Sequence, residues 1–202
     1  MKKYLAILAV IPMLMATSCG SAKSNEKPAS AYTQDSSMAA VENFEGKIET
    51  DENGVNTYSC PVYTISDYNN WKMDTQLAMA EDEYFVTFTN SDYPGISLSI
   101  TAYTGRGRKS TSTLVDELKE ENKKLEHFES ELNATYLGYK SENLMFENFQ
   151  AGTDHIRADY YLFDTGKALF KIEARFNADP GKYTQDKNAV DVILKQLEII
   201  ND

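Results

Sequence analysis

The strongest pattern of hydrophobic and polar positions in the chain lies between Ile156 and Phe176. Apolar residues alternate with polar ones before and after the short segment Asp164-Thr165-Gly166. Alternation with a period of two predicts strands with one buried face, and a glycine-containing segment between two such strands predicts a hairpin. We therefore expect a β-hairpin at the centre of the fold.

A three-residue loop of Asp164, Thr165 and Gly166, with Gly166 in the left-handed conformation, sets the register of this hairpin. On one face it pairs apolar residues: Leu162 with Ala168, Tyr160 with Phe170, Ala158 with Ile172, and Ile156 with Ala174. On the other face it pairs opposite charges: Asp159 with Lys171, and Arg157 with Glu173. A slip by one residue would place Lys171 and Glu173 against apolar residues, so burial favours this register.

Other segments rich in β-branched and aromatic residues predict further strands. They cover residues 62–65, 71–73, 84–89, 96–103, 135–139 and 144–151. Trp71, the only tryptophan, is expected to anchor the core, because its large ring gains much from burial. Cys60 lies in an extended apolar context and is expected to be a small buried residue rather than a nucleophile.

Apolar residues at helical spacing predict two helices. The first begins near the hydroxyl residues 110–113, which are good N-caps, and runs to about residue 128. Its apolar stripe consists of Leu114, Leu118, Leu125 and Phe128. The second is capped by Thr184 or Asp186, and its buried face consists of Val190, Ile193, Leu194 and Leu197. Strands and helices together predict an α+β fold in which an antiparallel β-sheet is flanked by two main helices.

The N-terminus is typical of a targeting segment. Lys2 and Lys3 precede an apolar run of twelve residues, which is too short to span a bilayer as a helix and suits a secretory signal. The run ends at Ala16-Thr17-Ser18-Cys19, which resembles the lipobox of bacterial lipoproteins, although Ala16 stands where leucine is usual. Ordinary signal-peptidase cleavage at the same bond is the alternative. We expect residues 1–18 to be removed and Cys19 to be lipidated.

Residues 20–56 are rich in Ser, Ala, Asn, Lys and Glu and predict a flexible linker, with a root-mean-square span of roughly 35 Å. The expected organisation is a signal peptide at 1–18, a lipidated N-terminus and linker at 19–56, and a single α+β domain at 57–202. Gly20, rather than aspartate, follows Cys19. By resemblance to the sorting rules of Gram-negative lipoproteins, this favours the outer membrane and a domain that faces the periplasm.

The formal net charge of −11 becomes −13 when Lys2 and Lys3 leave with the signal. A surface this acidic disfavours nucleic acid as a partner and repels anionic membrane faces. Acyl chains overcome that repulsion, at about 0.8 kcal/mol per buried methylene group. The membrane contact is therefore expected through the acyl chains on Cys19 alone. With Cys19 acylated, Cys60 has no cysteine partner for an internal disulfide.

A basic glycine loop leads into the first predicted helix and carries Arg106, Arg108 and Lys109. Because the N-terminus of a helix attracts anions, these residues are weak candidates for an anion site. The loop lacks the spacing of a phosphate-binding loop. Solvated charge near a turn is the alternative and is favoured.

Two further patterns touch on catalysis or metal binding. Asp154 precedes His155, but an acid–base role would need a third group and a cleft. Asp51-Glu52-Asn53-Gly54 resembles the start of a calcium loop, but the later glutamate is missing, which favours a solvated turn. The sequence contains neither a nucleophile motif nor metal-ligand spacing. We therefore expect no enzymatic activity, no cofactor and no metal.

Several features follow one another between residues 62 and 200. They are Tyr63-Thr64-Ile65 before Trp71-Lys72, the strands at 84–89 and 96–103, a helix from near Ser112, residues 146–151 ahead of the hairpin, and a closing helix that ends in Leu197-Glu198-Ile199. In pattern and order they resemble the PsbP-like superfamily, including its DcrB-like bacterial envelope lipoproteins. The resemblance implies an α/β/α sandwich that acts mainly as an accessory or assembly factor. It brings no catalytic residues.

These observations favour a lipid-anchored protein of the bacterial cell envelope whose non-catalytic domain supports another envelope component, with an envelope protein as its partner. A periplasmic carrier of a small ligand is the alternative, and it would need an apolar cavity ringed by a few polar groups. A hydrolase is disfavoured, because the sequence lacks a recognisable pair of nucleophile and base.

Overall fold

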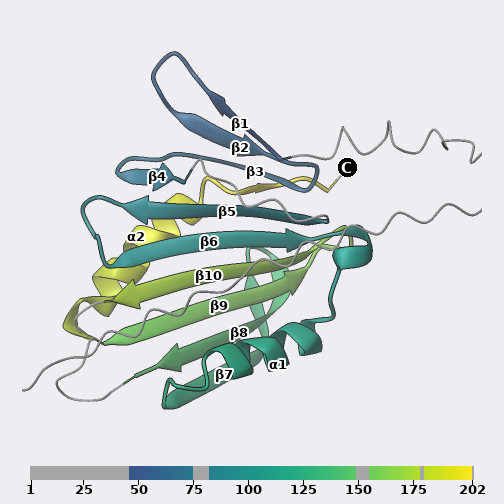
Figure 1. The fold of residues 1–202 in the computed structure, drawn as a ribbon, viewed down its shortest axis with the longest axis vertical. Helices are drawn as coiled ribbons and strands as arrows, with labels where there is room; N and C mark the ends of the chain where they lie inside the picture. The colour runs from purple at the N-terminus through teal and green to yellow at the C-terminus, as the bar shows by residue number, and fades with distance from the viewer. Residues whose placement is uncertain (1–45, 75–81, 149–154, 178–179, 202) are drawn as a thin grey trace, which may run out of the picture. The chain divides into compact units, whose positions relative to one another are not determined.

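The computed structural model describes residues 46–74, 82–148, 155–177 and 180–201. The signal peptide, Cys19 and Asp154 lie outside the described residues. The described part contains two antiparallel sheets and two α-helices (Figure 1). The predicted fold class, α+β with an antiparallel sheet flanked by two main helices, is confirmed.

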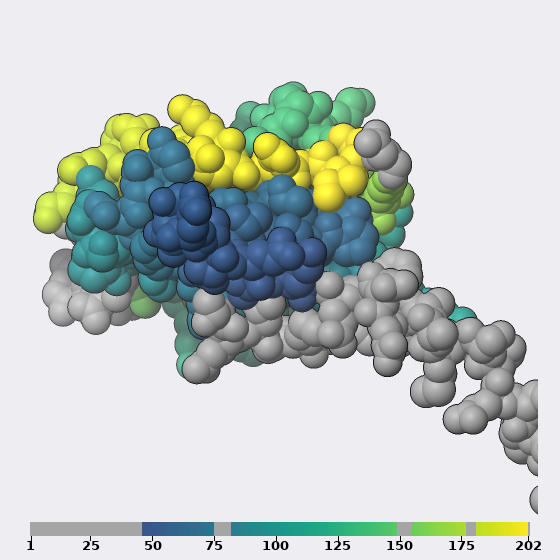
Figure 2. Space-filling view, turned by 90° about the horizontal axis from the view of Figure 1, so that it is seen from above, coloured from purple at the N-terminus to yellow at the C-terminus, as the bar shows by residue number. Residues whose placement is uncertain are grey.

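The larger sheet has seven strands in the order β4-β5-β6-β10-β9-β8-β7. Their bounds are β4 (Trp71–Met73), β5 (Glu83–Asn90), β6 (Ile96–Tyr103), β7 (His127–Tyr136), β8 (Tyr139–Glu147), β9 (Ile156–Asp164) and β10 (Leu169–Asn177). The smaller sheet, in the order β1-β2-β3-β11, consists of β1 (Lys47–Thr50), β2 (Asn56–Ser59), β3 (Tyr63–Ser66) and β11 (Glu198–Ile199). Figure 2 shows the yellow C-terminal residues alongside the blue strands near the start of the described chain.

The two helices, α1 (Thr111–Glu121) and α2 (Tyr183–Leu194), belong to different apolar clusters. Tyr160 and Leu162 of β9 share a cluster with the buried residues of α1. Tyr161 and Phe163, the alternate residues of β9, share the other cluster with α2 and the smaller sheet. Because successive side chains of a strand point to opposite faces, the larger sheet is covered on both faces.

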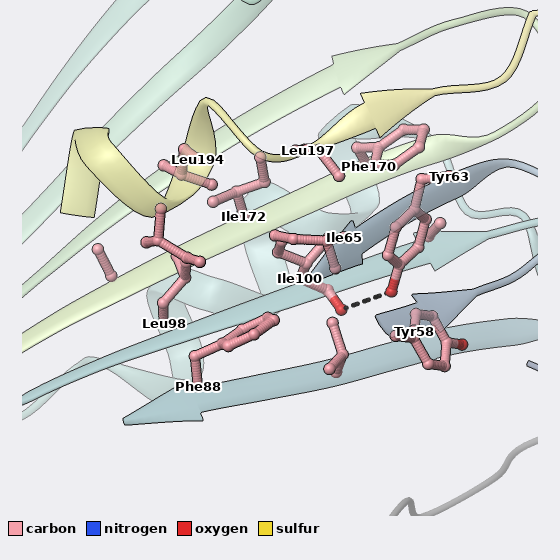
Figure 3. Packing of buried hydrophobic residues seen from close by; sticks show 14 of the residues in the cluster. Tyr58, Tyr63, Ile65, Phe88, Leu98, Ile100, Phe170, Ile172, Leu194 and Leu197 are labelled. Carbon is pink, nitrogen blue, oxygen red and sulfur yellow. Dashed lines mark hydrogen bonds between the residues drawn. The ribbon is translucent and has the colours of Figure 1, made fainter. Parts of the chain in front are cut away.

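The core beneath α2 and the smaller sheet is built from aliphatic and aromatic side chains (Figure 3). Ile172 and Ile100 are fully buried there, and the ring of Tyr63 meets that of Phe170 edge-on at 5.7 Å. The Tyr63 hydroxyl donates to the Ile100 carbonyl oxygen at 3.4 Å, which joins the two sheets (Figure 3). Trp71 is a core residue as predicted, and its Nε1 donates to the carbonyl oxygen of Ala189 in α2.

The end of α1 differs from the prediction of a helix to residue 128. Ser110 caps its start as expected, since its hydroxyl accepts from the backbone N–H of Thr113. The buried Asn122 ends it, because its side-chain amide donates to the Leu118 carbonyl oxygen and to the Tyr160 hydroxyl. Phe128, predicted on the helix stripe, instead lies in β7 and packs on Phe146 of β8, with 4.9 Å between ring centroids.

The strands after α1 are also displaced from their predicted positions. β7 and β8 form one hairpin around Leu137 and Gly138, in place of the separate strands predicted at 135–139 and 144–151. Both turn residues have positive φ, 50° and 85°, which matches the tight two-residue turns that join antiparallel strands. Leu125 and Phe128 are spaced as on one face of a helix, so the sequence does not predict the start of β7. Short apolar segments fit both the helical period and the period of a strand.

The predicted register of the central hairpin is wrong. Tyr160 lies opposite Glu173 and Asp159 opposite Ala174, a shift of three residues from the predicted pairs. The loop comprises residues 165–168, and its Gly166 has the expected left-handed conformation, with a φ of 88°. The burial argument fails because both faces of β9 are covered, so a shift by an odd number of residues exposes no apolar side chain.

Strand β1 lies within residues 19–56, which the sequence assigns to the linker. It pairs with β2, and Ile48 lies opposite Tyr58. The turn between them is held by Asp51, whose carboxylate accepts from the backbone N–H groups of Asn53 and Val55 at 2.9 and 2.8 Å. The ordered sheet therefore begins before residue 57. The Asp51 turn itself is exposed, as predicted for residues 51–54.

Candidate functional site

A cleft with a volume of about 400 Å³ lies between the β7–β8 hairpin and the first turns of α2. We call it the α2 cleft. Strand β9 forms its floor, since Asp159 and Tyr161 belong to the face that α2 covers. The residues that define it are Glu129, Glu131, Tyr136, Asn143, Met145, Arg157, Asp159, Tyr161, Tyr183 and Lys187.

Arg157 and Asp159 form a buried ion pair in this cleft. Arg157 Nε lies 2.8 Å from Asp159 Oδ1, and only 20% and 7% of the two side chains are exposed. The Tyr183 hydroxyl accepts from Arg157 Nη2 at 2.8 Å and donates to the Asp159 carboxylate. Burial opposes the charge of Arg157, but the hydrogen bond and the attraction of Asp159 outweigh it and raise the pKa of the guanidinium. Burial, together with the bond to Asp159, raises the pKa of Tyr183, so its hydroxyl stays protonated.

Aromatic rings also line the α2 cleft. Tyr136 stacks on Tyr161, with 4.0 Å between ring centroids and 11° between planes. Lys187 lies 6.0 Å from the centroid of the Tyr161 ring and 3.3 Å from the Asp191 carboxylate. The cleft thus combines stacked rings with charges held in fixed positions by their neighbours.

A second hollow, of about 510 Å³, continues along α2 toward its C-terminus. Tyr136 lines both hollows, and Leu137, Val192 and Lys195 line the second. Leu137 is 42% exposed and has a φ of 50°, which is unusual for a non-glycine residue. Because Tyr136 lines both hollows, we treat the strip between α2 and the β7–β8 hairpin as one continuous surface.

The predicted anion candidates lie away from this surface, beside the turn of the central hairpin. Arg108 donates to the Gly166 carbonyl oxygen at 2.7 Å and forms an ion pair with Asp164. Lys109 pairs with Glu117 of α1 at 2.8 Å. Arg106 is exposed on the short 3₁₀ turn Gly105–Gly107. Two of the three basic side chains therefore already hold a carboxylate, and an external anion would have to compete with it.

His155 does not meet the basic loop. It lies just before β9, with Nε2 2.7 Å from Glu147 Oε1, whereas Arg108 binds Asp164 at the far end of the same strand. At about 3.3 Å per residue, the two ends of β9 are separated by roughly 27 Å. Asp154, the other member of the predicted acid–base pair, is outside the described residues. The structure thus places His155 and Arg108 near opposite ends of β9.

Cys60 is buried as predicted. Only 7% of the residue is exposed, and its thiol donates to the Tyr63 carbonyl oxygen. Burial raises the pKa of the thiol to about 11, so the nucleophilic thiolate is scarce near neutral pH. Cys60 therefore has the properties of a small core residue.

The sequence does not predict the residues that build the α2 cleft. Its pattern places Arg157 and Asp159 on the face away from the core, opposite Glu173 and Lys171, because it does not show that α2 covers that face. Alternation does not predict the burial of Arg157 and Asp159, because β9 has polar and apolar residues on the same covered face. The i,i+2 spacing of Arg157 and Asp159 on a strand, followed by an amphipathic helix, was the available signal.

Among the described residues, neither α-helix combines the length and the hydrophobicity that crossing a bilayer requires. Within the same residues, no group of three or more His, Cys, Asp or Glu side chains could hold a metal ion.

Comparison with known proteins gives structural similarity only. No family model matches the chain, and neither does any curated protein. A solved structure from Bacteroides thetaiotaomicron matches with a TM-score of 0.42 and 14% identity, over 68% of this chain and 45% of that one. The chain therefore spans less than half the length of that protein.

Two further matches cover most of the length of the matched protein. Cyanobacterial PsbP from Synechocystis has a TM-score of 0.42 and 13% identity, over 77% of this chain and 92% of that one. LpqN of Mycobacterium tuberculosis, described as involved in cell envelope biogenesis, has a TM-score of 0.36 and 14% identity, over 84% and 99%. A PsbP is thus among the structures to which this chain is similar. Identities and TM-scores this low assign neither a family nor a function to the chain.

The ion pair of Arg157 and Asp159 leads to a prediction about stability. We expect Arg157→Ala to destabilise the domain by about 3–5 kcal/mol, because it leaves the buried Asp159 carboxylate without its cation. Lys47→Ala, which removes the exposed pair of Lys47 and Glu49, should cost at most about 1 kcal/mol. Urea unfolding of the two variants tests this difference. Equal losses would show that Asp159 does not depend on Arg157.

Proposed function

We propose that the chain is a lipid-anchored protein of the bacterial cell envelope, and that its domain binds and supports another envelope component without catalysing a reaction. The acyl chains on Cys19 would hold it at the membrane, and the linker would give the domain reach. The apolar run and the small residues before Cys19 support the anchor. Gly20 supports an outer-membrane location with the domain facing the periplasm.

The observation that carries the binding role is the α2 cleft. Arg157 is bound to Asp159 and Tyr183, and Lys187 is bound to Asp191. Charged side chains that neighbours already hold in place lose little conformational freedom when a partner binds. The surface is therefore pre-organised for recognition. Tyrosine rings add contact area at low entropic cost, and they are enriched at protein interfaces.

A small-ligand carrier is the second candidate. The α2 cleft has a volume of about 400 Å³, within the range of about 300–1,000 Å³ that small-molecule sites occupy. Its mixture of stacked rings and paired charges would suit a polar aromatic ligand better than a purely apolar one. We favour the protein partner, because the hollow continues along α2 for a further 510 Å³ and offers an extended surface.

The test is an affinity pull-down from detergent-solubilised envelopes with the full-length chain as bait. We expect a specific envelope protein to be recovered. Lys187→Glu, in the cleft, should reduce recovery by about tenfold, because it breaks the ion pair with Asp191 and sets two carboxylates against each other on the proposed binding surface. Lys167→Glu, in the exposed turn of the central hairpin, makes the same change in net charge and should leave recovery unaltered.

Two results would contradict the proposal. One is the absence of any specific protein in the wild-type pull-down. The other is turnover in a panel of hydrolase substrates that His155→Ala abolishes. A bound small molecule released from the purified chain on denaturation, together with a failed pull-down, would favour the carrier.

A further inference from the structure

Strand β7 lies at an edge of the larger sheet, near α1 in Figure 1. Among the strands of the described residues, it pairs only with β8. An edge strand presents backbone N–H and C=O groups that can pair with a further strand. The register shifts between Glu131 and Ala134, where Asn133 has a φ of 59°. Because a bulge interrupts regular pairing, the usable edge runs from His127 to Glu131, or roughly 17 Å.

The two faces of this edge differ in chemistry. Glu129 and Glu131 lie opposite Met145 and Asn143 and belong to the α2 cleft. Glu129 Oε1 also lies 2.9 Å from His127 Nε2, so a basic side chain of a partner would share this carboxylate with His127. Phe128, which packs on Phe146, points to the other face and lies under Lys119 of α1. Leu132 lines a hollow of about 350 Å³ together with Thr111 of α1. Phe128 within this edge and Leu132 just beyond it are 39% and 65% exposed, so apolar side chains lie on one face and the two glutamates on the other.

This pattern disfavours a second copy of the chain as the occupant. Antiparallel pairing of two β7 edges would bring glutamates of both copies opposite or diagonal to one another, and like charges in those positions are destabilising. The net charge of −11 adds long-range repulsion between copies. A basic strand would gain from the same glutamates.

We propose that the edge of β7 from His127 to Glu131 binds an extended segment of the envelope partner by strand addition, and that this segment alternates basic and apolar residues. The inference rests on the proposed binding function and names the chemistry of the partner. Its basic side chains lie beside Glu129 and Glu131, and its apolar side chains lie beside Phe128 and Leu132. Backbone hydrogen bonds supply affinity, and the alternating side chains supply specificity.

The experiment uses a synthetic probe, acetyl-Lys-Val-Lys-Val-Lys-Val-amide, and the full-length chain in a non-ionic detergent. Binding is measured by calorimetry, and amide hydrogen exchange of residues 127–131 is followed in parallel. We expect binding to slow exchange at this edge. Glu129→Lys with Glu131→Lys should weaken binding at least about tenfold, because two attractive pairs become repulsive.

Two matched controls separate strand addition from general attraction between charges. Glu49→Lys with Glu52→Lys makes the same change in net charge at the exposed β1–β2 hairpin and should alter binding by less than about twofold. A probe methylated on alternate backbone nitrogens keeps its charges and loses donors along one edge. It should bind at least about tenfold more weakly.

Equal effects of the two charge-reversed variants, or equal binding of the methylated probe, would overturn the proposal. If the melting temperature of the variant with Glu129→Lys and Glu131→Lys falls, Glu129→Gln with Glu131→Gln replaces it and should still weaken binding by several-fold.

Recovery of the native partner separates the proposal of strand addition from the broader proposal of a binding function. A partner recovered equally by wild type and by the β7 variant would refute strand addition and leave the binding function standing. Failure to recover any partner would refute the binding function, and the probe would still decide what the edge can bind.

Discussion

Ile172→Asp is expected to unfold the domain. Ile172 is fully buried in the middle of β10 and belongs to the cluster that joins the larger sheet to α2 and the smaller sheet. Its replacement removes an apolar side chain whose burial contributes about 1.5–3 kcal/mol. It also places a carboxylate where no partner is available, at a cost of several kcal/mol more. The sum approaches the whole stability of an ordinary domain, about 5–15 kcal/mol.

The measurement is thermal and urea unfolding followed by circular dichroism. Lys171→Asp is the matched control, since it introduces the same carboxylate one position earlier, on a half-buried side chain that faces the other way. It should cost less than Ile172→Asp, because position 171 is only half-buried. Ile172→Val should cost about 0.5–1.5 kcal/mol. An unchanged melting temperature for Ile172→Asp would contradict the two-faced core described above.

Cys19→Ala is expected to abolish lipidation and membrane association. The twelve-residue apolar run and the small residues before Cys19 predict acylation at this cysteine, and each buried methylene group of an acyl chain contributes about 0.8 kcal/mol to membrane binding. Two or three chains therefore account for stable attachment. An acidic domain has little other attraction to an anionic surface.

Metabolic labelling with a fatty acid and fractionation of the envelope test this expectation. Cys60→Ala is the control, because Cys60 is the other cysteine of the chain and is buried in the core. It should retain both label and membrane association. Labelling of Cys19→Ala at the wild-type level would show that the lipobox has been misassigned.

The local pattern of the sequence is enough to determine much of this protein. Strand β6 occupies the predicted residues 96–103, and Ser110 caps α1 as its hydroxyl predicts. Trp71 and Cys60 are buried as expected. Alternation, capping and turn chemistry act between residues close in sequence, so a single chain reveals them. The signal segment and Cys19 also follow from the sequence, as predictions that await their test.

Tertiary structure alone decided the register of the central hairpin and the place of the α2 cleft. The register depends on which faces of β9 are covered, and α1 and α2 cover both, so the pattern along β9 permits more than one pairing. Arg157, Asp159 and Tyr183 meet because α2 returns across the sheet to a strand that lies more than 20 residues earlier. The edge of β7 likewise follows from strand order, which depends on contacts between distant segments. Local propensity carries no information about such contacts, because they are selected by burial of the whole core.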